Sequence, residues 1–111
     1  MGGFARVLAI DLGASSGRGI VFTLEGGKLD SKVVHRFDNG AVEKDGRLYW
    51  DVNMLFDEIC AAINLADRQC GRLDSIGIDT WGVDIGFIGK DGRLMHCPRH
   101  YRDKSTAAAT D

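Results

Sequence analysis

The sequence predicts an α/β domain made of a small sheet and one long helix, and two observations support this fold class. Short apolar runs separated by glycine-rich turns come first, which is a pattern typical of strands and hairpins. A longer segment then places its apolar residues at helical spacing, and further strand-like runs follow it. The expected order is therefore β-β-β-α-β-β with a final helix begun, as in an incomplete domain.

Length and composition narrow the possible functions. The chain has 111 residues, enough to bury one core but too few for two full lobes with a cleft between them. Hydrophobic residues make up 44% and charged residues 27%, which argues against a disordered chain. The net charge of −2 offers no basic excess for a nucleic acid, and no apolar run is long enough to span a membrane. With no recognisable signal peptide and three unclustered cysteines, the chain is expected in the cytoplasm.

Three strands are expected first, at residues 7–12, 18–24 and 29–37. Glycine-containing turns at residues 13–17 and 25–28 separate them. The connections are too short for parallel pairing, which needs a crossover of about a dozen residues or more. The three strands should therefore form an antiparallel meander.

A loop over residues 38–44 and a hairpin-type turn at Asp45-Gly46 lead to the helix, expected over residues 51–69. Asp51 suits the N-cap, and Gly71 suits the stop just past the end. The apolar stripe of this helix comprises Val52, Leu55, Phe56, Ile59, Ala62, Ile63 and Ala66.

The helix leads at crossover distance into a fourth strand over residues 75–80, and a fifth is expected over residues 83–88. A turn at residues 90–92 follows. From Asp103 the chain becomes helix-like, with Ser105 as a candidate cap.

The sharpest chemical signal is the stretch 11–18, Asp-Leu-Gly-Ala-Ser-Ser-Gly-Arg. Asp11 ends a buried strand, where a carboxylate is costly unless it meets a cation or hydrogen-bond donors. The N–H groups of the following turn, with the Ser15 and Ser16 hydroxyls, can surround an anion, and Arg18 adds a planar donor fork for phosphate. A carboxylate beside a phosphate site calls for a bridging cation, usually Mg²⁺. The alternative is a plain hairpin with a surface arginine.

A second signal lies at residues 79–84, Asp-Thr-Trp-Gly-Val-Asp. Trp81 with the carboxylates of Asp79 and Asp84 suits a sugar, because an indole covers an apolar sugar face while carboxylates accept hydrogen bonds from hydroxyls. Gly82 would let the ligand approach the backbone. The alternative is a tight turn with a half-buried tryptophan.

These motifs resemble the N-terminal end of sugar kinases of the FGGY family, and within that family the rhamnulokinases. The first motif is shared in outline across the actin-like kinase superfamily, whereas residues 79–84 point to rhamnulokinases in particular. The stretches that carry the resemblance are residues 9–18, 35–40, 50–52, 74–84 and 101–103.

The resemblance implies the ribonuclease H-like fold of the actin-like ATPase superfamily, with ATP and Mg²⁺ as cofactors. It also implies transfer of the γ-phosphoryl group of ATP to the 1-hydroxyl of L-rhamnulose. Asp11 would lie beside the metal, and Gly82 would touch the sugar, with Trp81 added from its neighbourhood. The implied ATP-binding residues are Ala14, Ser15, Ser16, Gly17 and Arg18.

One departure from the family matters. The family's catalytic base is an aspartate in an Ala-Ser-His-Asp-like stretch, and no such stretch occurs here. The resemblance therefore implies that residues 1–111 form the N-terminal part of the N-terminal lobe. The C-terminal lobe would be absent, to be supplied covalently or as a separate partner, and the chain alone would be inactive. Two alternatives stay open: a non-catalytic fragment that at most binds nucleotide or a partner, and a kinase for another ketose.

Three further polar residues, His96, Cys97 and His100, match no zinc-ligand spacing and are expected in a solvated loop. His35 lies in a predicted strand, where it is expected to be a hydrogen-bonded packing residue.

Overall fold

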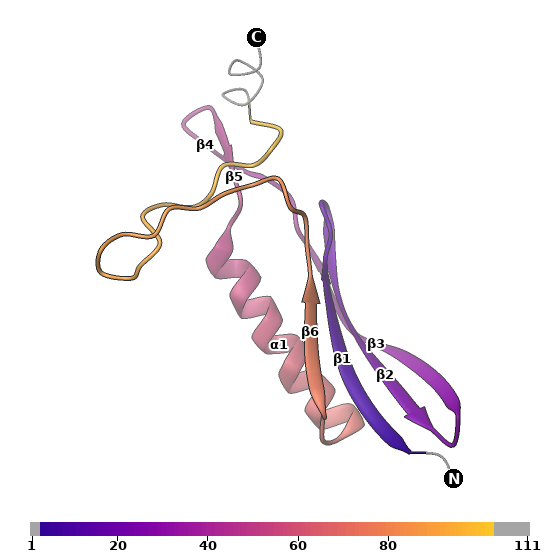
Figure 1. Cartoon of the computed structure of the whole chain (residues 1–111). Coiled ribbons are helices and arrows are strands. Elements are labelled where there is room, and N and C mark those ends of the chain that lie inside the picture. The colour runs from indigo at the N-terminus through magenta and orange to yellow at the C-terminus, as the bar shows by residue number, and fades with distance from the viewer. Residues whose placement is uncertain (1–2, 104–111) are drawn as a thin grey trace.

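The structure is a computed structural model that describes residues 3–103 (Figure 1). Four strands form one sheet in the order β3-β2-β1-β6, and β4 and β5 form a separate two-stranded hairpin. The elements in chain order are β1 (Phe4–Leu12), β2 (Ser16–Glu25), β3 (Lys28–Asp38), β4 (Val42–Lys44), β5 (Arg47–Tyr49), α1 (Val52–Cys70) and β6 (Ser75–Asp79).

The sheet confirms the expected meander and crossover. β1 pairs antiparallel with β2, and β2 pairs antiparallel with β3. β6 pairs parallel with β1 on the other side, so the chain must cross over between them, and α1 supplies the crossover along one face of the sheet (Figure 1). As a result, β1 and β6 end at the same edge of the sheet.

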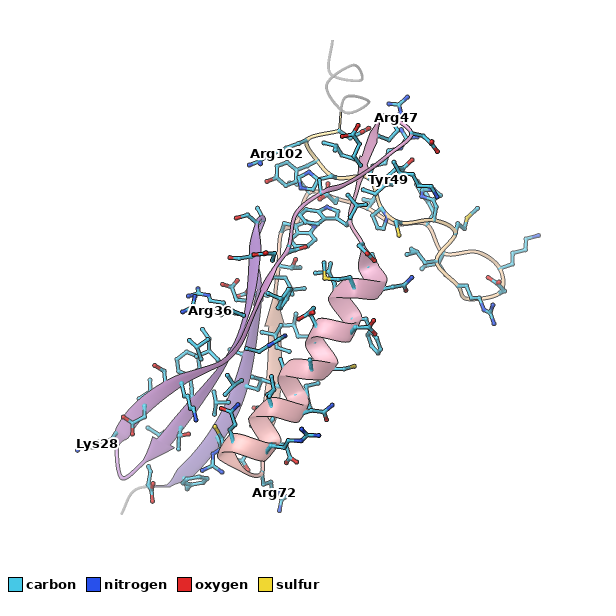
Figure 2. The ribbon with its side chains drawn as sticks, turned by 180° about the vertical axis from the view of Figure 1, so that it is seen from behind. Lys28, Arg36, Arg47, Tyr49, Arg72 and Arg102 are labelled. Atoms are coloured by element: carbon cyan, nitrogen blue, oxygen red, sulfur yellow. The ribbon has the colours of Figure 1, made fainter. Side chains whose placement is uncertain are left out.

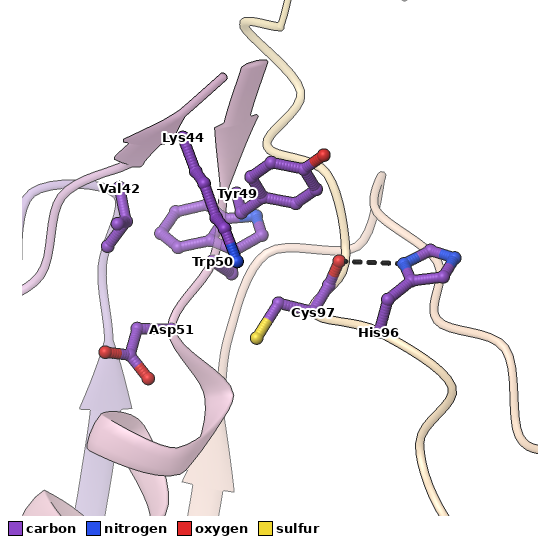
Figure 3. Close-up of a pocket in the computed structure, with 7 residues that line it drawn as sticks. All are labelled: Val42, Lys44, Tyr49, Trp50, Asp51, His96 and Cys97. Atoms are coloured by element: carbon purple, nitrogen blue, oxygen red, sulfur yellow. Dashed lines mark hydrogen bonds between the residues drawn. The ribbon is translucent and has the colours of Figure 1, made fainter. Parts of the chain in front are cut away.

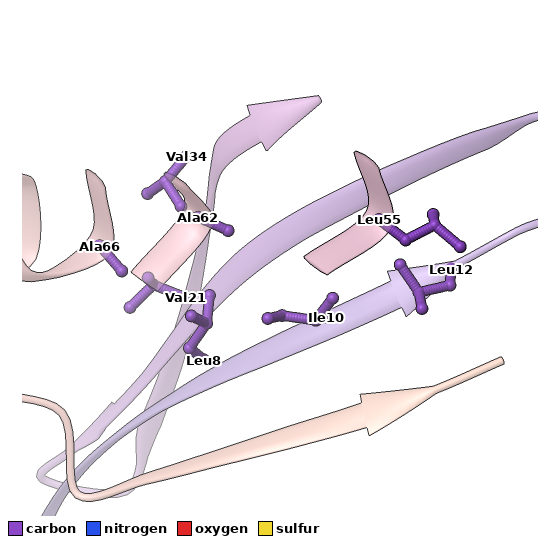
Figure 4. Packing of buried hydrophobic residues seen from close by; sticks show 8 residues of the cluster. All are labelled: Leu8, Ile10, Leu12, Val21, Val34, Leu55, Ala62 and Ala66. Carbon is purple, nitrogen blue, oxygen red and sulfur yellow. The ribbon is translucent and has the colours of Figure 1, made fainter. Parts of the chain in front are cut away.

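The core lies between α1 and the facing side of the sheet (Figure 4). Alternation along β1 sends Leu8, Ile10 and Leu12 toward the helix, where each is at most 8% exposed. A Cβ atom on Gly19 would lie 2.9 Å from the Cβ atom of Ala62, so the absence of a side chain lets the helix approach β2 closely. The core cluster comprises Leu8, Ile10, Leu12, Val21, Val34, Leu55, Ala62 and Ala66.

Both ends of α1 confirm the sequence prediction. The Asp51 side chain accepts a hydrogen bond from the Met54 N–H at 3.0 Å, which caps the first turn. The Gly71 N–H donates to the Asp67 carbonyl at 3.0 Å and closes the last turn.

The prediction for Phe56 is wrong: this ring is 64% exposed, because it lies about 100° around the helix from the buried Leu55. Within residues 3–103, no helix has the length and apolar character needed to cross a bilayer.

The expected strand over residues 83–88 is not formed. This segment makes one isolated bridge, between Ile88 and Leu94, and Val83 and Ile85 are more than 70% exposed. An alternating apolar pattern becomes a strand only where a neighbouring strand supplies a ladder of hydrogen bonds. Here residues 93–95 pair only with the end of the segment, through the Met95 N–H to the Phe87 carbonyl and the Gly89 N–H to the Arg93 carbonyl. The helix expected beyond Asp103, with its Ser105 cap, lies outside the described residues.

The segment before α1 is also more ordered than expected. The Asp45-Gly46 turn is confirmed, but β4 lies within residues 38–44, where a loop was expected, and pairs across the turn with β5. Asp103 is 1% exposed and accepts a hydrogen bond from the Leu48 N–H at 2.8 Å, which fixes the end of the described chain to β5.

Two histidines were also assigned an environment from the sequence. His100 is 2% exposed, so the expectation of a solvated loop was wrong for this residue. His35 confirms its prediction through a hydrogen bond to Glu58 on α1.

Candidate active site

The turn between β1 and β2 is tightly closed. The Gly13 N–H donates to the Ser16 carbonyl oxygen at 3.0 Å. A Cβ atom on Gly13 would lie 2.7 Å from the same oxygen, so a larger residue would push the turn open. The turn residues Ala14, Ser15 and Ser16 are exposed to solvent at the end of the sheet. The predicted ATP-binding stretch therefore begins in a compact, accessible turn and continues into β2, where Gly17 is buried and Arg18 is half-buried.

The buried Asn39 is hydrogen-bonded to this turn. It is 0% exposed, its Nδ2 donates to the Gly13 carbonyl at 2.8 Å, and its backbone N–H donates to the Ser15 carbonyl at 2.9 Å. Within residues 3–103, the N–H groups of Ala14 and Ser15 have no backbone acceptor. Two carbonyl groups of the turn thus accept hydrogen bonds from Asn39, whereas two of its N–H groups remain available to an anion. Sequence reasoning missed Asn39, since its contact spans 26 residues of chain.

One row of charges crosses the whole sheet. The register pairs Asp79 on β6 with Asp11 on β1, Asp11 with Arg18 on β2, and Arg18 with Arg36 on β3. Paired residues share a face, and the neighbouring Leu12 faces α1, so the row lies on the opposite face of the sheet. The row therefore has an acidic half, Asp79 and Asp11 on β6 and β1, and a basic half, Arg18 and Arg36 on β2 and β3.

The acidic half is an interacting pair. A hydrogen bond from the Asp79 carboxyl, together with the Arg18 guanidinium 3.2 Å away, lowers the pKa of Asp11. The same hydrogen bond to Asp11 raises the pKa of Asp79. Two adjacent carboxyls at the ends of parallel strands are an arrangement that suits a hard cation such as Mg²⁺. Sequence reasoning assigned the metal to Asp11 alone and considered Asp79 only for the sugar.

A hollow of about 290 Å³ opens beside the basic half. It reaches the end of the turn at Ser16, and both arginines of the charged row lie along it. Guanidinium groups and a serine hydroxyl are donors that match phosphate oxygens. The residues that line the hollow are Ser16, Gly17, Arg18, Arg36, Phe37 and Asp38.

The second motif follows β6 directly and is built around two tryptophans. Trp81 stacks on Trp50 with ring centroids 3.8 Å apart and an interplanar angle of 14°. Trp50 is 1% exposed and donates its indole N–H to Asp84. A Cβ atom on Gly82 would meet nothing within 4 Å, so the chain leaves open space there. One face of Trp81 is therefore covered by Trp50, and one oxygen of Asp84 is already engaged.

A hollow of about 330 Å³ lies beside this motif. Its lining residues are Val83, Asp84, Ile85, Phe87, His96 and Arg99. Sequence reasoning missed Trp50 as part of this region, although two tryptophans in so short a chain were a usable signal. Because Asp79 is both the last residue of β6 and the first residue of this motif, both predicted sites belong to the same edge of the sheet.

A third hollow, of about 390 Å³, lies between the β4-β5 hairpin, the start of α1 and the segment around His96 (Figure 3). Its wall is mainly apolar, and the His96 Nδ1 is hydrogen-bonded to the Cys97 carbonyl at 3.0 Å. It contains no residue of either predicted site. Its lining residues are Val42, Lys44, Tyr49, Trp50, Asp51, His96 and Cys97.

Comparison with known proteins supports a sugar-kinase relationship. No family model matches the chain. The chain is 42% identical to a rhamnulokinase of Bacteroides thetaiotaomicron over 103 residues, which is 93% of this chain and 21% of that protein. Rhamnulokinases of Ligilactobacillus salivarius and Lactiplantibacillus plantarum are 42% and 41% identical, over 90% and 89% of the chain. The chain thus spans about a fifth of the length of these relatives, consistent with their N-terminal segment.

Solved structures agree on the fold. Gluconate kinase from Lactobacillus acidophilus matches 96% of this chain with a TM-score of 0.75 and 17% identity, over 22% of its own length. Xylulose kinase from the same organism matches 96% of the chain with a TM-score of 0.70 and 18% identity, also over 22% of its length. The chain therefore shares the fold of the matched part of these two sugar kinases, and it is similar in sequence to rhamnulokinases over about a fifth of their length.

Proposed function

We propose that this chain is the phosphate- and metal-binding part of an ATP-dependent kinase that phosphorylates L-rhamnulose at its 1-hydroxyl. The observation that carries the proposal is the charged row. Its acidic and basic halves meet between Asp11 and Arg18, next to a turn with available N–H groups. Phosphoryl transfer depends mostly on positioning and charge neutralisation, and these residues are suited to both. Sequence similarity to rhamnulokinases supports the choice of sugar.

The roles divide along the row. The N–H groups of Ala14 and Ser15, the Ser16 hydroxyl, Gly17 at the hollow, and the Arg18 guanidinium would bind the phosphates of ATP. Asp11, and Asp79 beside it, would hold Mg²⁺, which neutralises phosphate charge when bound. The hydrogen bond from Asp79 and the Arg18 guanidinium, which lies 3.2 Å from Asp11, both lower the pKa of Asp11 and so favour its ionised carboxylate.

The sugar would lie against the second motif. Gly82 leaves room for close approach, and Trp81 offers the part of its indole that Trp50 does not cover. Asp84 is held by the Trp50 indole, which leaves its second oxygen for a sugar hydroxyl. We assign no catalytic base to this chain, because the family's base motif does not occur in its sequence.

A substrate comparison tests the proposal. The full-length protein that carries this chain is assayed for ADP release with MgATP and, in turn, L-rhamnulose, fuculose and xylulose. The proposal predicts the highest kcat/KM for L-rhamnulose. A clear preference for another ketose would correct the substrate and keep the kinase, whereas the absence of sugar-dependent ADP release with all three would contradict the kinase.

A second candidate is a chain that binds nucleotide without turning it over. It is favoured by one observation: the described residues supply anion-binding groups, whereas the family's base motif does not occur in the sequence. Nucleotide binding by the protein without ADP release in the same assay would support this candidate.

A further inference from the structure

We infer that Arg36 is a second phosphate-binding cation of the nucleotide site, an inference that rests on the proposed function. Arg36 and Arg18 are directly opposite each other on β3 and β2. Like charges directly opposite in an antiparallel pair repel each other and destabilise the sheet. Two adjacent guanidinium groups on an open face therefore call for an anion between or beside them.

The two arginines differ in their partners. Arg18 is paired with Asp11 at 3.2 Å. For Arg36, no ion pair is found among residues 3–103, and its side chain is exposed. Figure 2 shows Arg36 projecting from the side of the sheet that faces away from α1. Arg36 is thus the cation of the row whose charge is still available to a ligand.

The hollow of about 290 Å³ places this charge next to the turn. Arg36 lines it together with Ser16 and Gly17, which belong to the stretch proposed to bind ATP phosphates. Asp38 is the acidic residue on the same wall, and it forms no ion pair with Arg36. An anion held by the turn can therefore reach a planar, five-donor guanidinium group from β3 as well as from β2.

The test is a calorimetric titration of the full-length protein with the Mg²⁺ complex of a non-hydrolysable ATP analogue. Arg36→Gln removes the charge, and Arg68→Gln is the matched control, because Arg68 is exposed at the far end of α1. We expect Arg36→Gln to raise the Kd about tenfold or more, as for loss of a charge-assisted hydrogen bond, and Arg68→Gln to leave it unchanged. Adenosine, which has no phosphate, should bind both variants and the parent equally.

Thermal unfolding separates a binding role from a structural one. Removing Arg36 relieves its repulsion from Arg18, so Arg36→Gln should leave Tm equal or higher while nucleotide affinity falls. An unchanged Kd in Arg36→Gln, or equal losses for adenosine and the analogue together with a lower Tm, would overturn the inference. Arg36-dependent binding of inorganic phosphate in a parent protein that does not bind the analogue would overturn the nucleotide assignment. A parent that binds neither probe would instead contradict the proposed function.

Discussion

The strand register decides which single residues lie next to each other in the candidate site. Asp11 and Arg18 are seven positions apart in sequence, but pairing of β1 with β2 places them side by side, 3.2 Å apart. Asp79 reaches the same place from beyond the helix because β6 runs parallel to β1. A carboxylate flanked by a guanidinium and a second carboxyl is held ionised and in a defined position, which is what metal binding requires.

His100 is the residue whose titration should be visible in stability. Burial lowers its pKa from the ordinary value of 6.5. The unfolded chain therefore binds this proton more readily than the folded chain, and the free energy of unfolding should fall as the pH drops through 6.5 toward the lower folded pKa. At a pH above that range, His100 is neutral in both states and adds no pH dependence.

The measurement is urea unfolding of the parent, His100→Gln and the exposed-histidine control His96→Gln at about pH 7.5 and about pH 5.5, on either side of an ordinary histidine pKa. The loss of stability on acidification should shrink in His100→Gln and persist in His96→Gln. An identical loss in all three proteins would show that His100 is not the group responsible.

At the scale of elements, the end of β6 leads directly from the charged row into the second motif. Gly82→Val places a branched side chain where the backbone now leaves open space. We expect KM for the sugar to rise about tenfold from steric obstruction, with KM for ATP nearly unchanged. Steady-state kinetics of the full-length protein check this, and equal KM values for L-rhamnulose in variant and parent would remove Gly82 from the sugar site.

The elements that sequence patterns predicted correctly are those with strong local signals. The meander of β1, β2 and β3 followed from short connections, and α1 followed from its apolar period, the Asp51 cap and the Gly71 stop. The strand expected at residues 83–88 failed because pairing depends on a neighbouring strand that a local pattern cannot reveal.

The site was predicted in the same uneven way. The turn residues and Asp11 lie in one short stretch of sequence, so their chemistry could be inferred together. Arg36 and Asn39 join them only through β3, and Trp50 meets Trp81 only through the folding of α1 across the sheet. Such contacts depend on register and tertiary packing, which local spacing does not encode.

At the scale of the whole molecule, much apolar surface remains uncovered. The edge strand β6 exposes Ile76 and Ile78, and the following segment exposes Val83, Ile85 and Phe87, each at least 44% accessible.

We predict that a purified polypeptide of these 111 residues does not phosphorylate L-rhamnulose by itself. The family's base motif does not occur in its sequence, and general-base assistance contributes roughly 10²–10⁴-fold. Holding both substrates in place can supply about 7–11 kcal/mol more.

A coupled ADP-release assay on this polypeptide with ATP, Mg²⁺ and L-rhamnulose checks the prediction. Sugar-dependent ADP release that disappears in Asp79→Asn or Asp84→Asn would identify a base within the chain and contradict it.

The most direct test of the account is the Mg²⁺ dependence of ADP release in the full-length protein, compared between the parent, Asp11→Ala and the exposed-carboxylate control Asp57→Ala. Because Asp11 lies at the junction of the acidic and basic halves of the charged row, its removal should lower kcat about 10²-fold or more and raise the Mg²⁺ requirement. Asp57→Ala should behave as the parent. An Asp11→Ala protein with the parent's kcat and the parent's Mg²⁺ dependence would contradict the assignment of this sheet edge as the metal and phosphate site.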